Sequence, residues 1–213
     1  MSAPCLAEPE PLALVETMRL WRRRFRFADW HRARLAASAE VLGLPFDPSR
    51  WAAALREAAA RGPCGGALVR VVLDADGQIG WTTRPLAPLA RPLLLAMVPA
   101  DTSDPLLSHK TTRRGLYDAA LAHAQARGAA DALLVNAHGH ATETSRMNVF
   151  YRLRGRWHTP HASDGLLPGV LRAVLLTRRR VAERPLHVDE LARVEALCVG
   201  NSARGLLPAR LVD

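Results

Sequence analysis

Residues 132–150, ALLVNAHGHATETSRMNVF, predict two strands joined by a turn at His138-Gly139. A second turn, at Arg154-Gly155, extends the pair into an antiparallel meander. Glu143 lies just past the first turn, at the start of a strand otherwise built for burial. A buried carboxylate needs a cationic or hydrogen-bonding partner. Glu143 is therefore a candidate site residue, with a solvated turn glutamate as the alternative.

Helical and strand patterns alternate irregularly on both sides of this meander. The expected strands cover 12–27, 66–86 with a turn at Asp76-Gly77, 91–99, and a final group after 195. The expected helices are 29–44 with Asp29 as N-cap, one from Pro48 capped by Asp47, 111–127, 167–180, and a short one capped by Asp189. The absence of regular βαβ repetition indicates an α+β fold. A proline-rich hinge over 85–105 divides it into parts 1–100 and 101–213.

Composition limits the class of protein. The 213 residues are 49% hydrophobic and contain no apolar run long enough to span a membrane. The first residues carry acids and lack a basic start, so no signal peptide is expected. Cys5, Cys64 and Cys198 are isolated, which favours a reducing cytoplasm over a disulfide framework. The net charge of +9 and the stretch WRRRFRF (21–27) leave nucleic-acid binding as a minor alternative.

Lys110 is the only lysine in the sequence. Lysine and arginine together number 29, and the other 28 are arginine. Arginine stays protonated, whereas a lysine amine can lose its proton and form a Schiff base with a carbonyl. Arg113 and Arg114 follow closely and would favour the neutral amine. Lys110 is therefore a candidate nucleophile, although a leftover surface charge in an arginine-rich chain is the alternative.

Two segments could hold a phosphate. In LLPGVLR (166–172), Gly169 would allow close approach of a ligand, and the unpaired amides of Val170 and Leu171 would form an anion site. In VGNSARG (199–205), Asn201 and Ser202 offer a second contact. An ordinary helix start and an ordinary turn are the alternatives. The histidines lack the spacing of a metal site, so no metal is expected.

Taken in order, these motifs resemble the class IV aminotransferases, the fold-type IV pyridoxal-phosphate enzymes. The likeness rests on VETMR (15–19), HRARL (31–35), Lys110, the meander, GLLPGVLR (165–172) and VGNSARG, and it runs from about Leu14 to Leu211. It implies a small N-terminal α/β part and a larger C-terminal mixed sheet or barrel part. It also implies pyridoxal 5'-phosphate as cofactor and a homodimer.

The resemblance assigns roles to individual residues. Lys110 matches the Schiff-base lysine, Glu143 the partner of the ring nitrogen, and Arg34 the phosphate arginine. The other matches are Val170, Leu171, Asn201 and Ser202 for the phosphate and Val15, Thr17 and Arg19 for the substrate side. Arg19 and Arg113 are candidates for binding substrate carboxylates. Leu171 stands where the family often has threonine, so only its amide could serve the phosphate.

HKTTRR (109–114) and NSARG (201–205) most resemble the aminodeoxychorismate lyase branch. This branch converts 4-amino-4-deoxychorismate into 4-aminobenzoate and pyruvate in folate synthesis. The expected partner is thus a small anionic amino substrate, with a functional link to aminodeoxychorismate synthase and with neither nucleic acid nor membrane. The alternative is an aminotransferase for branched-chain or D-amino acids.

Overall fold

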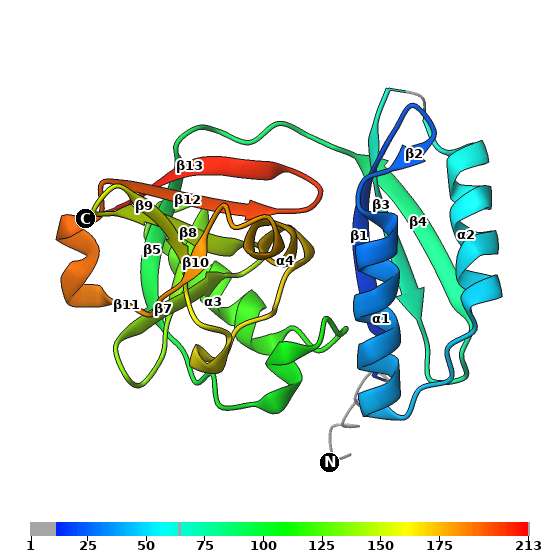
Figure 1. Ribbon diagram of the computed structural model, residues 1–213, viewed down its shortest axis with the longest axis horizontal. Helices are drawn as coiled ribbons and strands as arrows, with labels where there is room; N and C mark the ends of the chain where they lie inside the picture. The colour runs from blue at the N-terminus through cyan, green and yellow to red at the C-terminus, as the bar shows by residue number, and fades with distance from the viewer. Residues whose placement is uncertain (1–11, 64, 213) are drawn as a thin grey trace, which may run out of the picture.

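The computed structural model describes residues 12–63 and 65–212 and shows two bodies, each built around its own sheet (Figure 1). Cys5 and Cys64 lie outside the described residues. The α+β fold predicted from the sequence is confirmed, including a small N-terminal part and a larger part that closes into a barrel. No helix among the described residues is long and apolar enough to cross a membrane.

The smaller body is a four-stranded antiparallel sheet with one face covered by two helices. Its strand order is β2-β1-β3-β4, with β1 at Leu14–Trp21, β2 at Arg24–Phe25, β3 at Ala67–Leu73 and β4 at Ile79–Pro85. The covering helices are α1, Ala28–Leu42, and α2, Pro48–Arg61. Alternate residues of β1 and β3 pack against Leu35 and Trp51 of these helices. The period of two in a strand therefore leaves the remaining side chains on the opposite face.

The ends of the two helices follow the sequence expectations only in part. Asp47 caps α2 as predicted, accepting a hydrogen bond from the Ser49 amide at 2.7 Å. The expectation that Asp29 caps α1 is wrong, because the helix begins at Ala28 and Phe27 takes the N-cap position with φ 59°. The β1–β2 hairpin leads into Phe27, and the left-handed backbone of that residue marks the start of α1. Gly43 ends α1 in the left-handed conformation that glycine adopts without strain.

The larger body is a closed six-stranded barrel with extra edge strands. The order β8-β12-β13-β5-β6-β7 closes because β7 also pairs with β8. These strands are β5 Leu93–Pro99, β6 Asp131–Val135, β7 His140–Thr144, β8 Asn148–Leu153, β12 Ala196–Asn201 and β13 Gly205–Leu211. The edge strands are β9 Arg156–Thr159, β10 Ala182–Glu183 and β11 Leu186–His187. Because β5 pairs with β6 and β13, the boundary between the sheets lies in 86–92 rather than after residue 100.

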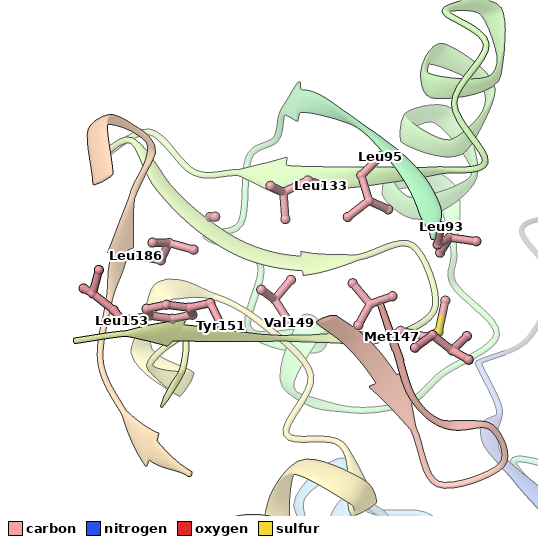
Figure 2. Packing of buried hydrophobic residues seen from close by; sticks show 11 residues of the cluster. Leu93, Leu95, Leu133, Met147, Val149, Tyr151, Leu153 and Leu186 are labelled. Atoms are coloured by element: carbon pink, nitrogen blue, oxygen red, sulfur yellow. The ribbon is translucent and has the colours of Figure 1, made fainter. Parts of the chain in front are cut away.

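The barrel interior is filled by side chains from every wall. Leu95, Leu133 and Val149 are fully buried, and Figure 2 shows them pointing into one apolar layer between the strands. Tyr151 closes one end of this layer and donates its hydroxyl to the carbonyl oxygen of Arg184 at 2.8 Å. The barrel is therefore a packed core rather than a channel.

The helices of the larger body start later than their sequence patterns predicted. The helix expected over 111–127 is α3, Gly115–Ala126, because Thr111 instead forms an isolated antiparallel bridge with Leu14. The helix expected over 167–180 is α4, Val170–Thr177. The short helix over Val188–Arg193 is of the 3-10 type and is capped by His187, so Asp189 as its cap is wrong. The other 3-10 turns are Pro105–Ser108 and Ala162–Asp164.

Truncation of the barrel core tests this packing. We expect Leu133→Ala to destabilise the protein by about 2–5 kcal/mol, because Leu133 is fully buried and its loss leaves a cavity. Leu206→Ala is the matched control, since Leu206 is 43% exposed and should cost well under 1 kcal/mol. Urea unfolding of both variants measures the difference, and equal losses would contradict a barrel interior centred on Leu133.

Candidate active site

A cleft lies where the two bodies meet, lined by β1, α1, the segment 104–117, the β7–β8 turn, the start of α4 and the β12–β13 turn. Its open space amounts to about 870 Å³, including the mouth. A short antiparallel contact forms the seam beside it. Val15 donates its amide to the carbonyl of Lys110 at 2.8 Å, and Thr112 donates to Ala13 at 2.9 Å. This contact fixes Lys110 at the boundary between the bodies.

The Lys110 amine is held in an environment that favours its neutral form. Burial is the main cause and the charge of Arg34 adds to it, so the pKa of Lys110 falls to about 8 although Glu16 opposes the shift. Arg114 and Arg70 contribute further in the same direction. About a tenth of the amine would therefore be unprotonated at pH 7, far more than for an ordinary lysine, and the neutral form is the one that a nucleophile or a general base requires.

Glu143 lies across the same cleft as a buried carboxylate. Its side chain is 4% exposed and accepts hydrogen bonds from the Tyr117 hydroxyl and the Leu167 amide, both at 2.8 Å. Asn148 adds a longer one at 3.4 Å. Burial raises the pKa of Glu143 to about 7, and these donors and Lys110 only partly oppose it. A cationic group placed beside Glu143 would restore its charge.

Arg34 reaches the cleft from α1 and is held by a buried carboxylate behind it. Its Nε and Nη2 atoms donate to Glu16 at 2.8 and 2.6 Å. His31, one helical turn earlier, lies 2.5 Å from the same carboxylate through Nδ1. Burial alone would raise the pKa of Glu16, but the Arg34 charge and the His31 contact outweigh it and hold that pKa at about 2. Glu16 thus fixes the orientation of Arg34.

The start of α4 and the β12–β13 turn form the end of the cleft suited to an anion. Gly169 is the N-cap of α4, and no side chain caps this helix start, which leaves its first amides for a ligand. A Cβ at residue 169 would overlap the amide oxygen of Asn148, so this close approach requires glycine. Asn201 and Ser202 line the cleft from the turn.

The structure brings most of the sequence-predicted site residues into this cleft. Its lining includes Thr17, Arg34, Lys110, Arg113, Glu143, Val170, Asn201 and Ser202. They come from both bodies and from segments far apart in the chain, as Figure 1 shows for α1 and α4. Their roles toward a ligand stay predictions.

Three predicted residues do not line the cleft. Val15 is buried and meets Lys110 only through its backbone. Leu171 is 4% exposed and its side chain points toward Gly200 of β12. Arg19 is two residues after Thr17 on the same face of β1, and it lines a separate hollow, with its guanidinium over the Trp21 ring. Arg19 is therefore not in position to bind a substrate carboxylate in this cleft.

Sequence reasoning missed several residues of the site. Glu16 could have been found from the sequence, because a carboxylate among the buried residues of a strand needs a cationic partner. His31 and Arg34, one helical turn apart, could supply that partner. Asn148 could also have been found, because the antiparallel meander expected from the sequence continues past Glu143, and Asn148 pairs with Glu143 across the β7–β8 turn. Tyr117 could not have been found, because its distance from Glu143 in the chain gives no hint of contact.

Comparisons with known proteins agree with this arrangement. The family model described as amino-transferase class IV matches residues 13–212. A Schizosaccharomyces pombe protein named "Putative aminodeoxychorismate lyase" is 31% identical over 85% of this chain and 82% of its own. The structure of a "Putative amino-acid aminotransferase" from Mesorhizobium loti covers 94% of this chain and 100% of its own at 39% identity and a TM-score of 0.88. A "Putative 4-amino-4-deoxychorismate lyase" from Legionella pneumophila covers 94% and 83% at 26% identity and a TM-score of 0.86.

The Glu16 cluster makes a prediction about stability and pH. Because the folded-state pKa of Glu16 lies near 2 and its ordinary value is 4.5, its ionised form stabilises the fold above pH 4.5. We expect Glu16→Gln to cost about 3 kcal/mol at pH 7. The difference from the unchanged protein should shrink as the pH falls from 4.5 towards 2. Urea unfolding at several pH values measures it, and a difference independent of pH would contradict the ionised pair.

Proposed function

The chain belongs to the class IV aminotransferase family, a family of pyridoxal-phosphate enzymes, and we propose that it is a 4-amino-4-deoxychorismate lyase. In this reaction the substrate is divided into 4-aminobenzoate and pyruvate. The observation that carries the proposal is the pairing, in one cleft, of an amine with a lowered pKa and a buried carboxylate with a raised one. Two groups whose environments move their pKa values in opposite directions are typical of catalytic sites.

The residues of the cleft fit pyridoxal 5'-phosphate. Arg34, the uncapped start of α4 and the turn at Asn201–Ser202 supply donors for a phosphate. Among the described residues, no cationic side chain is hydrogen-bonded to the buried carboxylate of Glu143. Such a carboxylate suits the role of partner to a protonated ring nitrogen. Lys110 is the only amine side chain in the sequence and can react with an aldehyde. When bound, the cofactor supplies a ring that accepts electrons from the bond being broken.

Each of these cleft residues then has a distinct role. With the cofactor bound, Lys110 would hold it through Nζ and would serve as the general base and acid that moves the substrate proton. Glu143 in its charged form would pair with a protonated ring nitrogen. Arg34 would bind the phosphate, while Glu16 keeps the Arg34 guanidinium in place. Arg113, in the cleft lining, is the candidate for one substrate carboxylate. We propose that the enzyme works as a cytoplasmic homodimer, like the family it resembles.

An aminotransferase acting on branched-chain or D-amino acids is the second candidate. The relative from Mesorhizobium loti, which is named an amino-acid aminotransferase, favours it. The two activities require the same amine, carboxylate and phosphate site, and they differ in where the electrons go afterwards. Analysis of the products separates them, because the lyase releases pyruvate from aminodeoxychorismate and the transferase needs a keto acid.

Replacement of Lys110 tests the proposal. Lys110→Arg keeps the positive charge but cannot react with the aldehyde, so we expect loss of the yellow absorbance of the cofactor-loaded protein and of nearly all turnover. The assay follows 4-aminobenzoate and pyruvate from aminodeoxychorismate, beside an amino acid plus keto acid reaction. Lys110→Ala with added methylamine is the second arm, and partial recovery is expected. Wild-type colour and rate in Lys110→Arg would overturn the proposal.

Replacement of Glu143 separates catalysis from cofactor binding. We expect Glu143→Gln to fold, bind the cofactor and lose at least tenfold in turnover, about 1.4 kcal/mol on the barrier. Protonation of Glu143 below pH about 7 should also weaken cofactor binding in the unchanged protein but not in the variant. Fluorescence titration with pyridoxal phosphate from pH 5.5 to 8.5 measures this. The control is Glu57→Gln on α2, and unchanged turnover in Glu143→Gln would remove Glu143 from the site.

A further inference from the structure

Three chain segments that carry cleft residues are tied together at Asp164, which itself does not line the cleft. Asp164 ends the 3-10 turn Ala162–Asp164. Its main-chain carbonyl accepts hydrogen bonds from the Thr102 hydroxyl at 2.9 Å and from the Asn136 side-chain amide at 3.1 Å. Its carboxylate lies 2.9 Å from Nδ1 of His140, so that ring nitrogen is the donor. Asp164 therefore joins the stretch between β5 and α3, the β6–β7 turn and the stretch that precedes α4.

Two of these segments lead to the reactive groups of the cleft. Thr102 precedes Lys110 on a stretch whose one regular element is a 3-10 turn. His140 begins β7, the strand that carries Glu143. The pairing of β7 with β6 is irregular next to Glu143, so the ladder to β6 is interrupted there. The strand therefore needs another contact to fix where this carboxylate lies, and His140 supplies one at the start of β7.

The third segment leads to the end of the cleft suited to an anion. After Asp164 it carries Leu167, whose amide donates to Glu143 at 2.8 Å and whose carbonyl accepts from the Asn148 side chain at 2.8 Å. It ends at Gly169, the N-cap of α4. A shift of this segment against the other two would change the distances between the amine, the carboxylate and the helix start.

Close packing holds the segments where they meet at Asp164. The Asn136 side chain is buried, and its Oδ1 atom accepts from the amides of His138 and His140, both at 3.0 Å, which shapes the β6–β7 turn. On the other side, a Cβ at Gly165 would overlap the carbonyl oxygen of Thr102. The three segments therefore approach one another as closely as their backbones allow.

The carboxylate of Asp164 depends on His140 alone. Its side chain is 10% exposed, and among the described residues its Oδ2 atom is buried without a hydrogen-bond partner. The rings of His138 and His187 lie farther out, 6.4 and 5.9 Å from the His140 ring. A buried pair of this kind adds little to stability, because the loss of water offsets the attraction. What it does add is one directional bond between β7 and the segment before α4.

We propose that Asp164, together with His140, is a positioning residue for the reaction: it sets how Lys110, Glu143 and the start of α4 lie relative to one another. It acts only through these groups. The inference rests on the proposed function, because the three groups work together only when one cofactor spans them. The affinity for the cofactor and the surroundings of the bound cofactor then depend on a residue outside the cleft.

Cofactor binding tests the inference without turnover. Pyridoxal phosphate is titrated into each variant by tryptophan fluorescence, and the yellow absorbance of the loaded protein is recorded. We expect Asp164→Ala to bind the cofactor about tenfold more weakly and to shift the absorbance maximum. Asp164→Asn keeps an oxygen that can accept from His140, so it should retain most of the affinity. Asp164→Ala combined with His140→Ala should be no worse than either change alone, since the two side chains act as a unit.

A control in the smaller body separates lost stability from lost position. Asp47→Ala removes the cap of α2, a helix that contributes no residue to the cleft. It should lower the urea midpoint and leave the affinity and the absorbance maximum unchanged. Thr102→Val is a milder change for the case in which Asp164→Ala does not fold, because it removes one hydroxyl at nearly constant shape. It should weaken cofactor binding about threefold.

The outcomes separate this inference from the proposed function. Unchanged affinity and absorbance in Asp164→Ala, or equal changes in Asp47→Ala, would overturn the positioning role, and so would unchanged affinity in Thr102→Val if Asp164→Ala does not fold. Pyruvate release from aminodeoxychorismate by the unchanged protein is measured on the same preparation. Pyruvate without the dependence on Asp164 would leave the lyase and remove the positioning role. The dependence on Asp164 without pyruvate would keep the positioning role and remove the lyase.

Discussion

The backbone contact between residues 13–15 and 110–112 is the constraint on which the site depends. It joins β1 of the smaller body to the segment that precedes α3. Main-chain bonds from Val15 to Lys110 and from Thr112 to Ala13 set the position of Lys110, and the Thr112 hydroxyl adds to them by accepting from the Ala13 amide. The contact puts the lysine within the influence of Arg34 from one body and Arg114 from the other. The low pKa of the amine is thus a property of the docked bodies, since neither one alone supplies all the groups that cause it.

Two buried carboxylates support the cleft in opposite ways. Glu16 is surrounded by cationic and hydrogen-bonding side chains and stays charged to low pH, so it acts as a fixed anchor for Arg34. Glu143 has neutral donors around it and a raised pKa, so its charge depends on what enters the cleft. The same side-chain chemistry therefore gives one structural residue and one residue prepared for a cationic partner. Burial is alike in the two cases, and the neighbours make the difference.

Local chemistry explains which features could be predicted from the sequence. The turn at Asp76-Gly77, the cap at Asp47 and the glycine at the start of α4 follow from backbone preferences of the residues themselves. The late start of α3 could not be predicted, because Thr111 is held by pairing with a strand nearly one hundred residues earlier. The same reason removed Arg19 from the cleft: the match to a motif gives the strand, but strand register decides which side chains reach the seam.

The parallel pairing of β5 with β13 has a consequence for how the protein becomes functional. Leu93 lies opposite Ala209, so the barrel closes only when segments from distant parts of the chain have met. Pairings of such long sequence separation form slowly because loop-closure entropy is lost before they contribute. The turn that carries Asn201 and Ser202 connects β12 to β13, so it is held at the cleft only once β13 has paired with β5. In a partly folded chain, even one with the smaller sheet complete, Lys110 would be an ordinary solvated lysine and the anion site would be missing. The amine would therefore become reactive toward aldehydes only once the cleft around it has formed.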